Sequence, residues 1–162
     1  MAPTPPLRTD RLILRGFVPE DAPEVGRILG AWELARALLV VPHPLEEGWA
    51  EWFVEASRRA SESGERISFA VALREGGRLV GDVLLKPNPR DENAELAYFV
   101  SVPYWGRGYA TEAVGEVVRY GFEELGLHRV HSDHFGSNPA SGRAMRKVGM
   151  SHEGTRPEHY KK

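Results

Sequence analysis

The sequence of 162 residues contains no cysteine. This absence excludes disulfides, thiolate metal sites and cysteine nucleophiles, and it is typical of proteins in a reducing cytoplasm. The sequence also lacks an apolar run of the roughly 20 residues that a membrane-spanning helix needs. Its first residues, MAPTPPLRTD, do not contain the apolar segment of a secretion signal. We therefore expect a cytoplasmic protein with no membrane partner.

A large excess of one charge is missing too. The chain has 21 Lys and Arg against 23 Asp and Glu, which gives a formal net charge of -2. This balance argues against a basic surface for direct nucleic-acid binding. The length and the 41% of hydrophobic residues suit one globular domain spanning residues 1–162.

Apolar periodicity and turn residues predict an alternation of strands and helices. Strands are expected at Leu12–Val18, at 67–74 and 78–86 around a Gly76-Gly77 turn, at Ala94–Ser101, at Arg129–Phe135 and within 151–162. Helices are expected over about Pro19–Gly30 with one or two further turns, from Leu45 to about Ser63, over about Gly108–Leu125, and within 138–150 before Gly149. This order predicts an α/β (α+β) fold, in which an antiparallel meander and one strand–helix–strand crossover share a mixed sheet.

The stretch VPYWGRGYATEAV, residues 102–114, joins the strand at 94–101 to the long helix. Gly106, Gly108 and Ala110 alternate where the helix begins, and a helix N-terminus has free N–H groups and a partial positive charge. Small residues there let an anion reach the backbone. Arg107 adds a charge and Thr111 a hydroxyl donor, so the stretch predicts a phosphate or pyrophosphate site.

Three other interpretations of this stretch fit less well. A nucleoside-triphosphate loop needs a lysine and a Ser or Thr after its second glycine, and neither stands there. A dinucleotide fingerprint needs a third glycine or alanine where the sequence has Thr111, and the glycines should directly follow their strand. A purely structural turn does not account for Arg107, Thr111 and the preceding Tyr104-Trp105 pair.

VPYWGRGYATEAV resembles the acetyl-CoA-binding motif of the GNAT superfamily of N-acetyltransferases, Q/R-x-x-G-x-G/A. Trp105 stands at the Gln/Arg position, as in the branch of ribosomal-protein-alanine N-acetyltransferases, the Rim type. Two further blocks resemble this branch: LRTDRLILRGFVPEDAPEV near the N-terminus, and NPASGRAMRKVGMSHEG, which is similar to N-x-x-S-x-R-x-x-x-K-x-G-[FM]-x-x-EG. The resemblance covers nearly the whole chain.

The resemblance implies a GNAT fold in which the strand before the motif splays from the strand after the helix, and acetyl-CoA lies in the V between them. It implies that the backbone of Val100 and Val102 pairs with the pantetheine amides. The pyrophosphate is expected on N–H groups of five residues: Arg107, Gly108, Tyr109, Ala110 and Thr111. Asn138 is similar to the asparagine that contacts the cofactor, although with Pro139 next to it the same residue also predicts a helix N-cap.

The implied reaction is direct acetyl transfer from acetyl-CoA to an amine. Glu95 is the candidate base, with a solvated residue at a strand start as the alternative. Alternation places Glu95, Ala97 and Phe99 on one strand face. Many family members have a tyrosine acid where this chain has Met145, so Ser141 is the candidate acid, with an ordinary first-turn serine as the alternative.

Two further groups of residues are weighed for binding. His131 and Asp133 should share one face of a strand while His134 faces the other, and without a third ligand at suitable spacing no metal site is expected. Trp32, Trp49 and Trp52 are expected in the core.

The acceptor is the open question. The family usually has a further strand after the segment that ends here in EGTRPEHYKK. We therefore expect an acceptor side that is open or completed by a partner, and a homodimer through the sheet edge is one possibility. The preferred acceptor is a protein N-terminal α-amino group. The alternatives are a small amine, an amino-acid derivative or an antibiotic and, in another class, a non-catalytic acyl-CoA sensor or interaction module.

Overall fold

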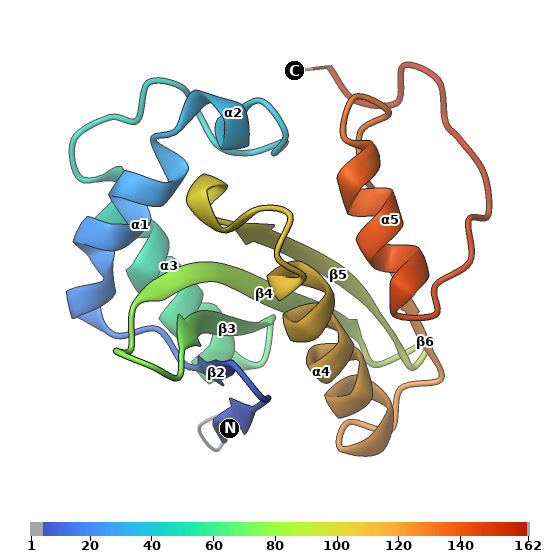
Figure 1. Ribbon diagram of the computed structural model, residues 1–162. Coiled ribbons are helices and arrows are strands. Elements are labelled where there is room, and N and C mark those ends of the chain that lie inside the picture. The colour runs from blue at the N-terminus through green and yellow to red at the C-terminus, as the bar shows by residue number, and fades with distance from the viewer. Residues whose placement is uncertain (1–4, 162) are drawn as a thin grey trace.

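The chain forms a six-stranded sheet with helices on both faces (Figure 1). The computed structural model describes residues 5–161. The strands, in the spatial order β1-β2-β3-β4-β5-β6, are β1 (Leu7–Arg8), β2 (Leu12–Arg15), β3 (Ile67–Leu73), β4 (Leu79–Asn88), β5 (Asn93–Val100) and β6 (Arg129–His131). The α-helices are α1 (Ala22–Leu29), α2 (Trp32–Ala35), α3 (Trp49–Ser63), α4 (Tyr109–Glu123) and α5 (Pro139–Lys147), with 3₁₀ turns at Pro19–Asp21 and Val102–Tyr104.

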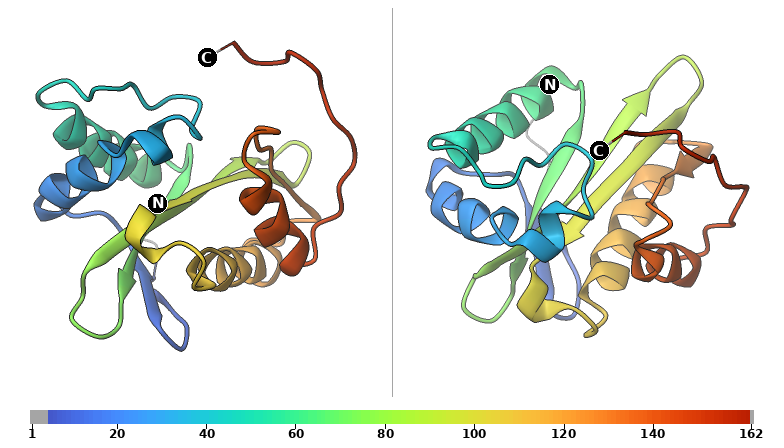
Figure 2. Two further views of the ribbon diagram at one scale, coloured as in Figure 1. Left: turned by 45° about the horizontal axis from the view of Figure 1, so that its top comes forward. Right: turned by 90° about the horizontal axis from the view of Figure 1, so that it is seen from above.

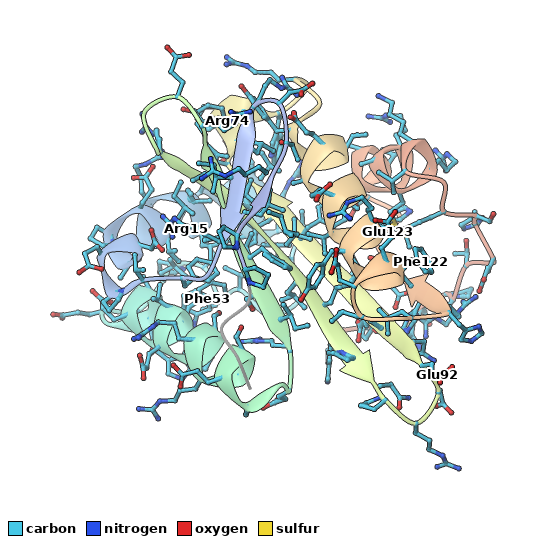
Figure 3. All side chains as sticks on the ribbon, turned by 90° about the horizontal axis from the view of Figure 1, so that it is seen from below. Arg15, Phe53, Arg74, Glu92, Phe122 and Glu123 are labelled. Atoms are coloured by element: carbon cyan, nitrogen blue, oxygen red, sulfur yellow. The ribbon has the colours of Figure 1, made fainter. Side chains whose placement is uncertain are left out.

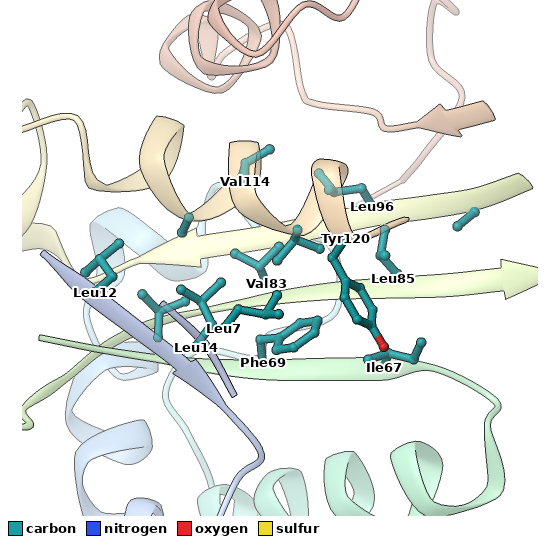
Figure 4. Close-up of a cluster of buried hydrophobic side chains, with 14 of the residues drawn as sticks. Leu7, Leu12, Leu14, Ile67, Phe69, Val83, Leu85, Leu96, Val114 and Tyr120 are labelled. Atoms are coloured by element: carbon teal, nitrogen blue, oxygen red, sulfur yellow. The ribbon is translucent and has the colours of Figure 1, made fainter. Parts of the chain in front are cut away.

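Two hydrophobic cores hold the helices to the sheet. The core under α4 contains Leu14, Phe69, Leu96, Val114 and Tyr120 (Figure 4), and the ring of Tyr120 meets that of Phe69 edge-on at 5.5 Å between centroids. The other core lies under α1, α2 and α3. Because strand side chains alternate between faces, β3 and β4 contribute to both cores.

A partly buried ion pair joins β2 to the 3₁₀ turn that leads into α1. Arg15 reaches both carboxylate oxygens of Asp21, from Nη1 to Oδ2 at 2.8 Å and from Nη2 to Oδ1 at 2.9 Å. The backbone N–H of Val18 donates to the same carboxylate at 2.9 Å. Arg15 lies on the strand side of this junction (Figure 3), so the pair joins the sheet edge to the first helical turn.

The parallel pairing of β5 with β6 is short. It joins Asn93 to Arg129, Ala94 to Val130 and Glu95 to His131, whereas the other neighbouring strands are antiparallel. Within residues 5–161, no strand follows β5 on this side from Leu96 to Val100. The chain after β6 diverges from β5 toward α5 (Figures 1 and 2), and we use the term β5 opening for the separation of the backbone between the unpaired edge of β5 and α5. The predicted mixed sheet with a splayed strand pair is confirmed.

Several expected boundaries are wrong. Residues 151–161 form no strand, and Lys162 lies outside the described residues. This segment has no alternating apolar residues to bury; it is tied down by ion pairs instead, from Arg129 to Glu153 at 2.7 Å and from Arg156 to Asp133. The strand predicted to Phe135 ends at His131, and α3 begins at Trp49 instead of Leu45.

The two-residue strand β1 was not predicted. It forms a tight hairpin with β2, closed by a bond from the N–H of Thr9 to the carbonyl of Leu12 at 3.0 Å. Two residues are too few to show a period. No helix within residues 5–161 has the length and apolarity to cross a membrane.

Candidate functional site

The N-terminus of α4 presents free backbone donors. Gly106 and Gly108 have φ values of +73° and +79°, a region that side chains with a Cβ rarely adopt. Gly108 is the N-cap of α4 and has no side chain to bond the first N–H groups of the helix. The first helical hydrogen bond runs from the N–H of Glu112 to the carbonyl of Gly108 at 3.0 Å. The N–H groups of residues 109–111 precede this bond and have no acceptor within the helix. This arrangement fits a diphosphate.

Arg11 holds this turn in place from the β1–β2 hairpin. Its Nη1 donates to the carbonyl of Arg107 at 2.9 Å and its Nε to Glu112 Oε2 at 2.7 Å, while its guanidinium carbon lies 4.1 Å from the ring centroid of Tyr109. Partial burial raises the pKa of Glu112, but the hydrogen bonds from Arg11 and Thr9 lower it by more. The pKa of Glu112 therefore lies below its usual value. The turn is thus braced by an ion pair between segments 101 residues apart.

The edge of β5 that faces the opening carries backbone groups that no strand pairs. The N–H of Ser101 donates to Val80 on β4 at 2.7 Å, so the backbone of the preceding residue, Val100, faces the opening. The carbonyl of Val100 accepts a 2.7 Å bond from Trp105 Nε1. Val102 lies beyond the strand in the 3₁₀ turn, and its carbonyl accepts from the N–H of Trp105 at 3.1 Å.

Two hydroxyls meet across the opening. Tyr98 of β5 and Ser141 of α5 have their side-chain oxygens 2.6 Å apart, and the Tyr98 hydroxyl also donates to the Ser141 carbonyl at 2.9 Å. Burial raises the pKa of Tyr98, and the hydrogen bond with Ser141 opposes that shift. Asn138 caps α5, because its Oδ1 accepts from the N–H of Ser141 at 3.4 Å, so the predicted N-cap is confirmed.

Glu95 lies apart from this hydroxyl pair. It is the last residue of β5 that pairs with β6, and its side chain is exposed beside Lys86 and His131 in the neighbouring strands. Tyr98 packs toward α4, whereas Phe99 packs into the core on the other sheet face. By alternation Glu95 belongs to the face of Phe99, so the two predicted catalytic residues lie on opposite faces.

The expected histidine geometry and part of the expected tryptophan packing are wrong. Asp133 lies beyond β6, where it pairs with Arg156. The ring of His134 lies against α5, since a Cβ at Gly142 would stand 2.6 Å from its Nε2. Within the described part of the chain, residues 5–161, no group of three or more His, Asp or Glu is placed to hold a metal ion. Trp32 and Trp52 are exposed because α2 and the outer face of α3 are uncovered, whereas Trp49 is partly buried against the core.

Asp82 on β4 has a fully buried carboxyl group, and it is not among the predicted site residues. Only 2% of Asp82 is exposed, and its Oδ1 has no hydrogen-bond partner. Two further buried polar atoms, Arg66 Nε and Ser68 Oγ, also lack partners. Burial raises the pKa of Asp82 from 3.8 to about 7, against the opposing charge of Arg66. The carboxyl is therefore mostly protonated in the folded protein below pH 7.

Asp82 should make the folded protein less stable as the pH rises from about 4 to about 7. Because its folded-state pKa lies above its unfolded value, the unfolded chain releases this proton first, and stability falls across the interval and then levels off. The interval corresponds to about 4 kcal/mol at 1.36 kcal/mol per pKa unit. Urea unfolding of the wild type and Asp82→Asn from pH 4 to 8 measures it. The variant should lose most of this slope and be the more stable protein at pH 8; equal slopes would contradict the assignment.

Comparisons with known proteins agree with this geometry. The family model described as an acetyltransferase (GNAT) domain matches residues 11–151. The chain is 29% identical over 152 residues, which is 93% of it and 85% of the relative, to the uncharacterized N-acetyltransferase YoaA of Bacillus subtilis.

Solved structures match the fold at lower identity. Ribosomal-protein-S5-alanine acetyltransferase from Vibrio fischeri matches with a TM-score of 0.79 and 18% identity, over 93% of this chain and 85% of that one. The microcin C7 self-immunity acetyltransferase MccE, solved with acetyl-CoA and AMP, matches with a TM-score of 0.80 and 14% identity, over 90% and 82%. The chain belongs to the GNAT family and is an acetyl-CoA-dependent N-acetyltransferase.

Proposed function

We propose that this N-acetyltransferase acts on α-amino groups, with a protein N-terminus as the preferred acceptor, in the manner of the Rim-type branch. The motif WGRGYATEA supports the branch, as does the fold shared with a ribosomal-protein acetyltransferase. Neither feature touches the acceptor, so the proposal depends on what the β5 opening offers to an amine.

The exposure of Glu95 is the observation that carries this proposal. An acceptor amine must lose its proton before it attacks. Glu95 is a solvated carboxylate at the last pairing of β5 with β6, so it is too weak a base to deprotonate a strongly basic amine efficiently. An α-amino group has a pKa near 8, so about a tenth of it is neutral at pH 7, whereas only about one lysine side chain in 2,500 is neutral. The site therefore suits the weaker base.

We assign different residues around the β5 opening to different parts of acetyl-CoA. We assign the diphosphate to the N–H groups of Arg107, Gly108, Tyr109, Ala110 and Thr111, with the Arg107 side chain as a further cation. We assign the pantetheine amides to Val100 and, from the 3₁₀ turn, Val102. Asn138 uses its Oδ1 in the α5 cap, which leaves its amide nitrogen to face the donor.

Bound acetyl-CoA supplies an activated acetyl thioester. In the transfer a C–N bond forms from the amine lone pair and the thioester C–S bond breaks, with its electron pair going to sulfur. One proton passes from the nitrogen through water to Glu95. Another passes from the Ser141 hydroxyl to the sulfur, while Tyr98 positions Ser141 through the hydrogen bond between their hydroxyls. By alternation Glu95 projects from the face of β5 opposite to Tyr98, which bonds Ser141, so the proton acceptor and the proton donor approach the reacting carbon from different sides.

A panel of acceptors tests the proposal. Release of CoA and the mass of the product are measured with peptides that have a free N-terminus, with the same peptides carrying a blocked N-terminus and an internal lysine, and with small amines. We expect kcat/KM to be at least about tenfold higher for the free N-terminus than for the blocked peptide. Preference for the lysine side chain would contradict the α-amino proposal, and tight acetyl-CoA binding without turnover on any amine would favour a sensor.

Replacing Glu95 by Gln should lower turnover at neutral pH and leave it near the wild-type value at high pH. At high pH the acceptor is neutral without help, so the base is no longer needed. The profile of kcat/KM from pH 6 to 10 measures this, with Glu92→Gln in the adjoining loop as the matched exposed control. A wild-type profile for the Glu95 variant would remove Glu95 from the mechanism.

A further inference from the structure

A cavity of about 870 Å³ lies beside the loop that leads into α5. It is bounded on one side by α2 and the following residues 39–43, and on the other by residues 135–137 and Tyr160. Residues 135–137 lead directly into Asn138 and so into the helix that carries Ser141. The views in Figures 1 and 2 agree that α2 and the C-terminal segment approach each other, and the cavity between them adjoins the loop that leads to Ser141.

The walls of this cavity expose large apolar side chains. Trp32 is 56% exposed and Val40 is 80% exposed, and Leu39 and Tyr160 are exposed as well. The ring of Trp32 packs against that of His43, with 5.1 Å between centroids. Single exposed apolar residues are ordinary, but several around one hollow indicate a surface that is covered by an apolar ligand.

Among the lining residues within 5–161, Arg36 is the only Asp, Glu, Lys or Arg. It is the C-cap of α2 and follows Trp32 by four residues, about one helical turn, so both side chains leave the chain on the same side. The guanidinium has no ion-pair or side-chain hydrogen-bond partner among residues 5–161, although many other arginines of this chain are paired. Arg36 is exposed, and an unpaired guanidinium at the rim of a largely apolar hollow is suited to a carboxylate, which it can hold with two parallel hydrogen bonds.

We propose that the acceptor is an α-amine with an apolar, preferably aromatic, side chain and a carboxylate that pairs with Arg36. This inference rests on the proposed function, because the cavity selects what the β5 opening acetylates. The carboxylate has two possible sources. It is either the α-carboxylate of a free amino acid or an acidic side chain near the N-terminus of a peptide, and both present the same group to Arg36.

Matched acceptors test the carboxylate. Phenylalanine is compared with 2-phenylethylamine, which lacks only the carboxylate, and a peptide starting Phe-Asp with one starting Phe-Asn, all at equal concentrations of neutral amine. We expect kcat/KM to be at least about tenfold higher for the acidic member of one pair. A preference within the first pair identifies a free amino acid, and one within the second a peptide. Equal values within both pairs would overturn the inference.

Replacing Arg36 by Gln should raise the KM for the preferred acidic acceptor by about 10- to 100-fold, the usual worth of a charge-assisted bond. Its kcat and the constants for the neutral partner should change little. Arg59→Gln, on the exposed side of α3, is the control and should leave all constants unchanged. An Arg36 variant that keeps the wild-type preference would overturn the inference.

A binding measurement separates this inference from the proposed function. Calorimetric titration with N-acetylphenylalanine and with an N-acetylated Phe-Asp peptide needs no turnover. At least one of them should bind the wild type and bind Arg36→Gln at least about tenfold more weakly. If no amine is acetylated but this difference holds, the proposed function fails and the carboxylate site stands. If turnover is normal and neither ligand distinguishes the two proteins, the carboxylate site fails and the proposed function stands.

Discussion

Replacing Gly108 by Val is expected to weaken acetyl-CoA binding by at least about 100-fold. Gly108 has a φ of +79°, which a β-branched residue adopts only under strain. A Cβ there would already touch Arg11 Nη2 at 3.5 Å, so the two further methyl groups of valine crowd the arginine that holds the Arg107 carbonyl. Both effects move or cover the N–H groups that we assign to the diphosphate. Isothermal titration with acetyl-CoA measures the loss.

A second glycine provides the control for this experiment. Gly126, just past the other end of α4, has a φ of +68° and open space where a Cβ would stand. Gly126→Val therefore imposes a comparable backbone strain away from the proposed binding turn. We expect it to lower the unfolding temperature while keeping the acetyl-CoA affinity of the wild type. An unchanged affinity in Gly108→Val, or an equal loss in both variants, would contradict the assignment of this turn to the diphosphate.

Replacing Ser141 by Ala is expected to lower kcat by about 100-fold, the low end of what a positioned proton donor contributes. The KM for acetyl-CoA should change little, because Ser141 is assigned to the departing thiolate. Tyr98 is a positioning residue that acts through Ser141, since its hydroxyl lies 2.6 Å from Ser141 Oγ. Tyr98→Phe should therefore lower kcat by about tenfold, and the double variant should be no slower than Ser141→Ala alone.

Steady-state kinetics of the three variants measure this coupling, with thermal unfolding of each as a check on the fold. Ser151→Ala, at an exposed position in the segment that follows α5, provides the matched serine control and should keep the wild-type kcat. Losses that multiply in the double variant would show that the two hydroxyls act independently. A Ser141 variant with normal kcat would remove the hydroxyl pair from the chemistry.

Much of the fold could be predicted because its signals are local. Gly76-Gly77 marks the β3–β4 hairpin, and the apolar spacing after Gly108 marks α4, which the structure places at Tyr109–Glu123. The two-residue strand β1 carries too little pattern to be found. The strand predicted within residues 151–162 is absent from 151–161, because this segment lacks the apolar alternation that would hold it in the sheet.

In the proposed site, too, local features could be predicted from the sequence and long-range contacts could not. The turn at Gly106–Gly108 and the Asn138 cap depend on neighbouring residues, and both could be predicted from short motifs. The pairs that hold the site together could not, because Tyr98 and Ser141 are 43 residues apart and Arg11 and Glu112 are 101 apart. The free guanidinium of Arg36 is likewise visible only once α2 and the C-terminal segment are seen around one cavity.

Where acetyl-CoA binds is the central claim, and amide chemical-shift changes during an acetyl-CoA titration of the ¹⁵N-labelled protein test it most directly. We predict the largest changes at Tyr109–Thr111, at the backbone of Tyr98 and Val100, and at the start of α5. A second hollow, of about 550 Å³ beside the β1–β2 turn and lined by Arg8, Asp10 and Glu116 among others, provides the comparison. Changes concentrated at that hollow, with residues 109–111 and β5 unaffected, would contradict the account.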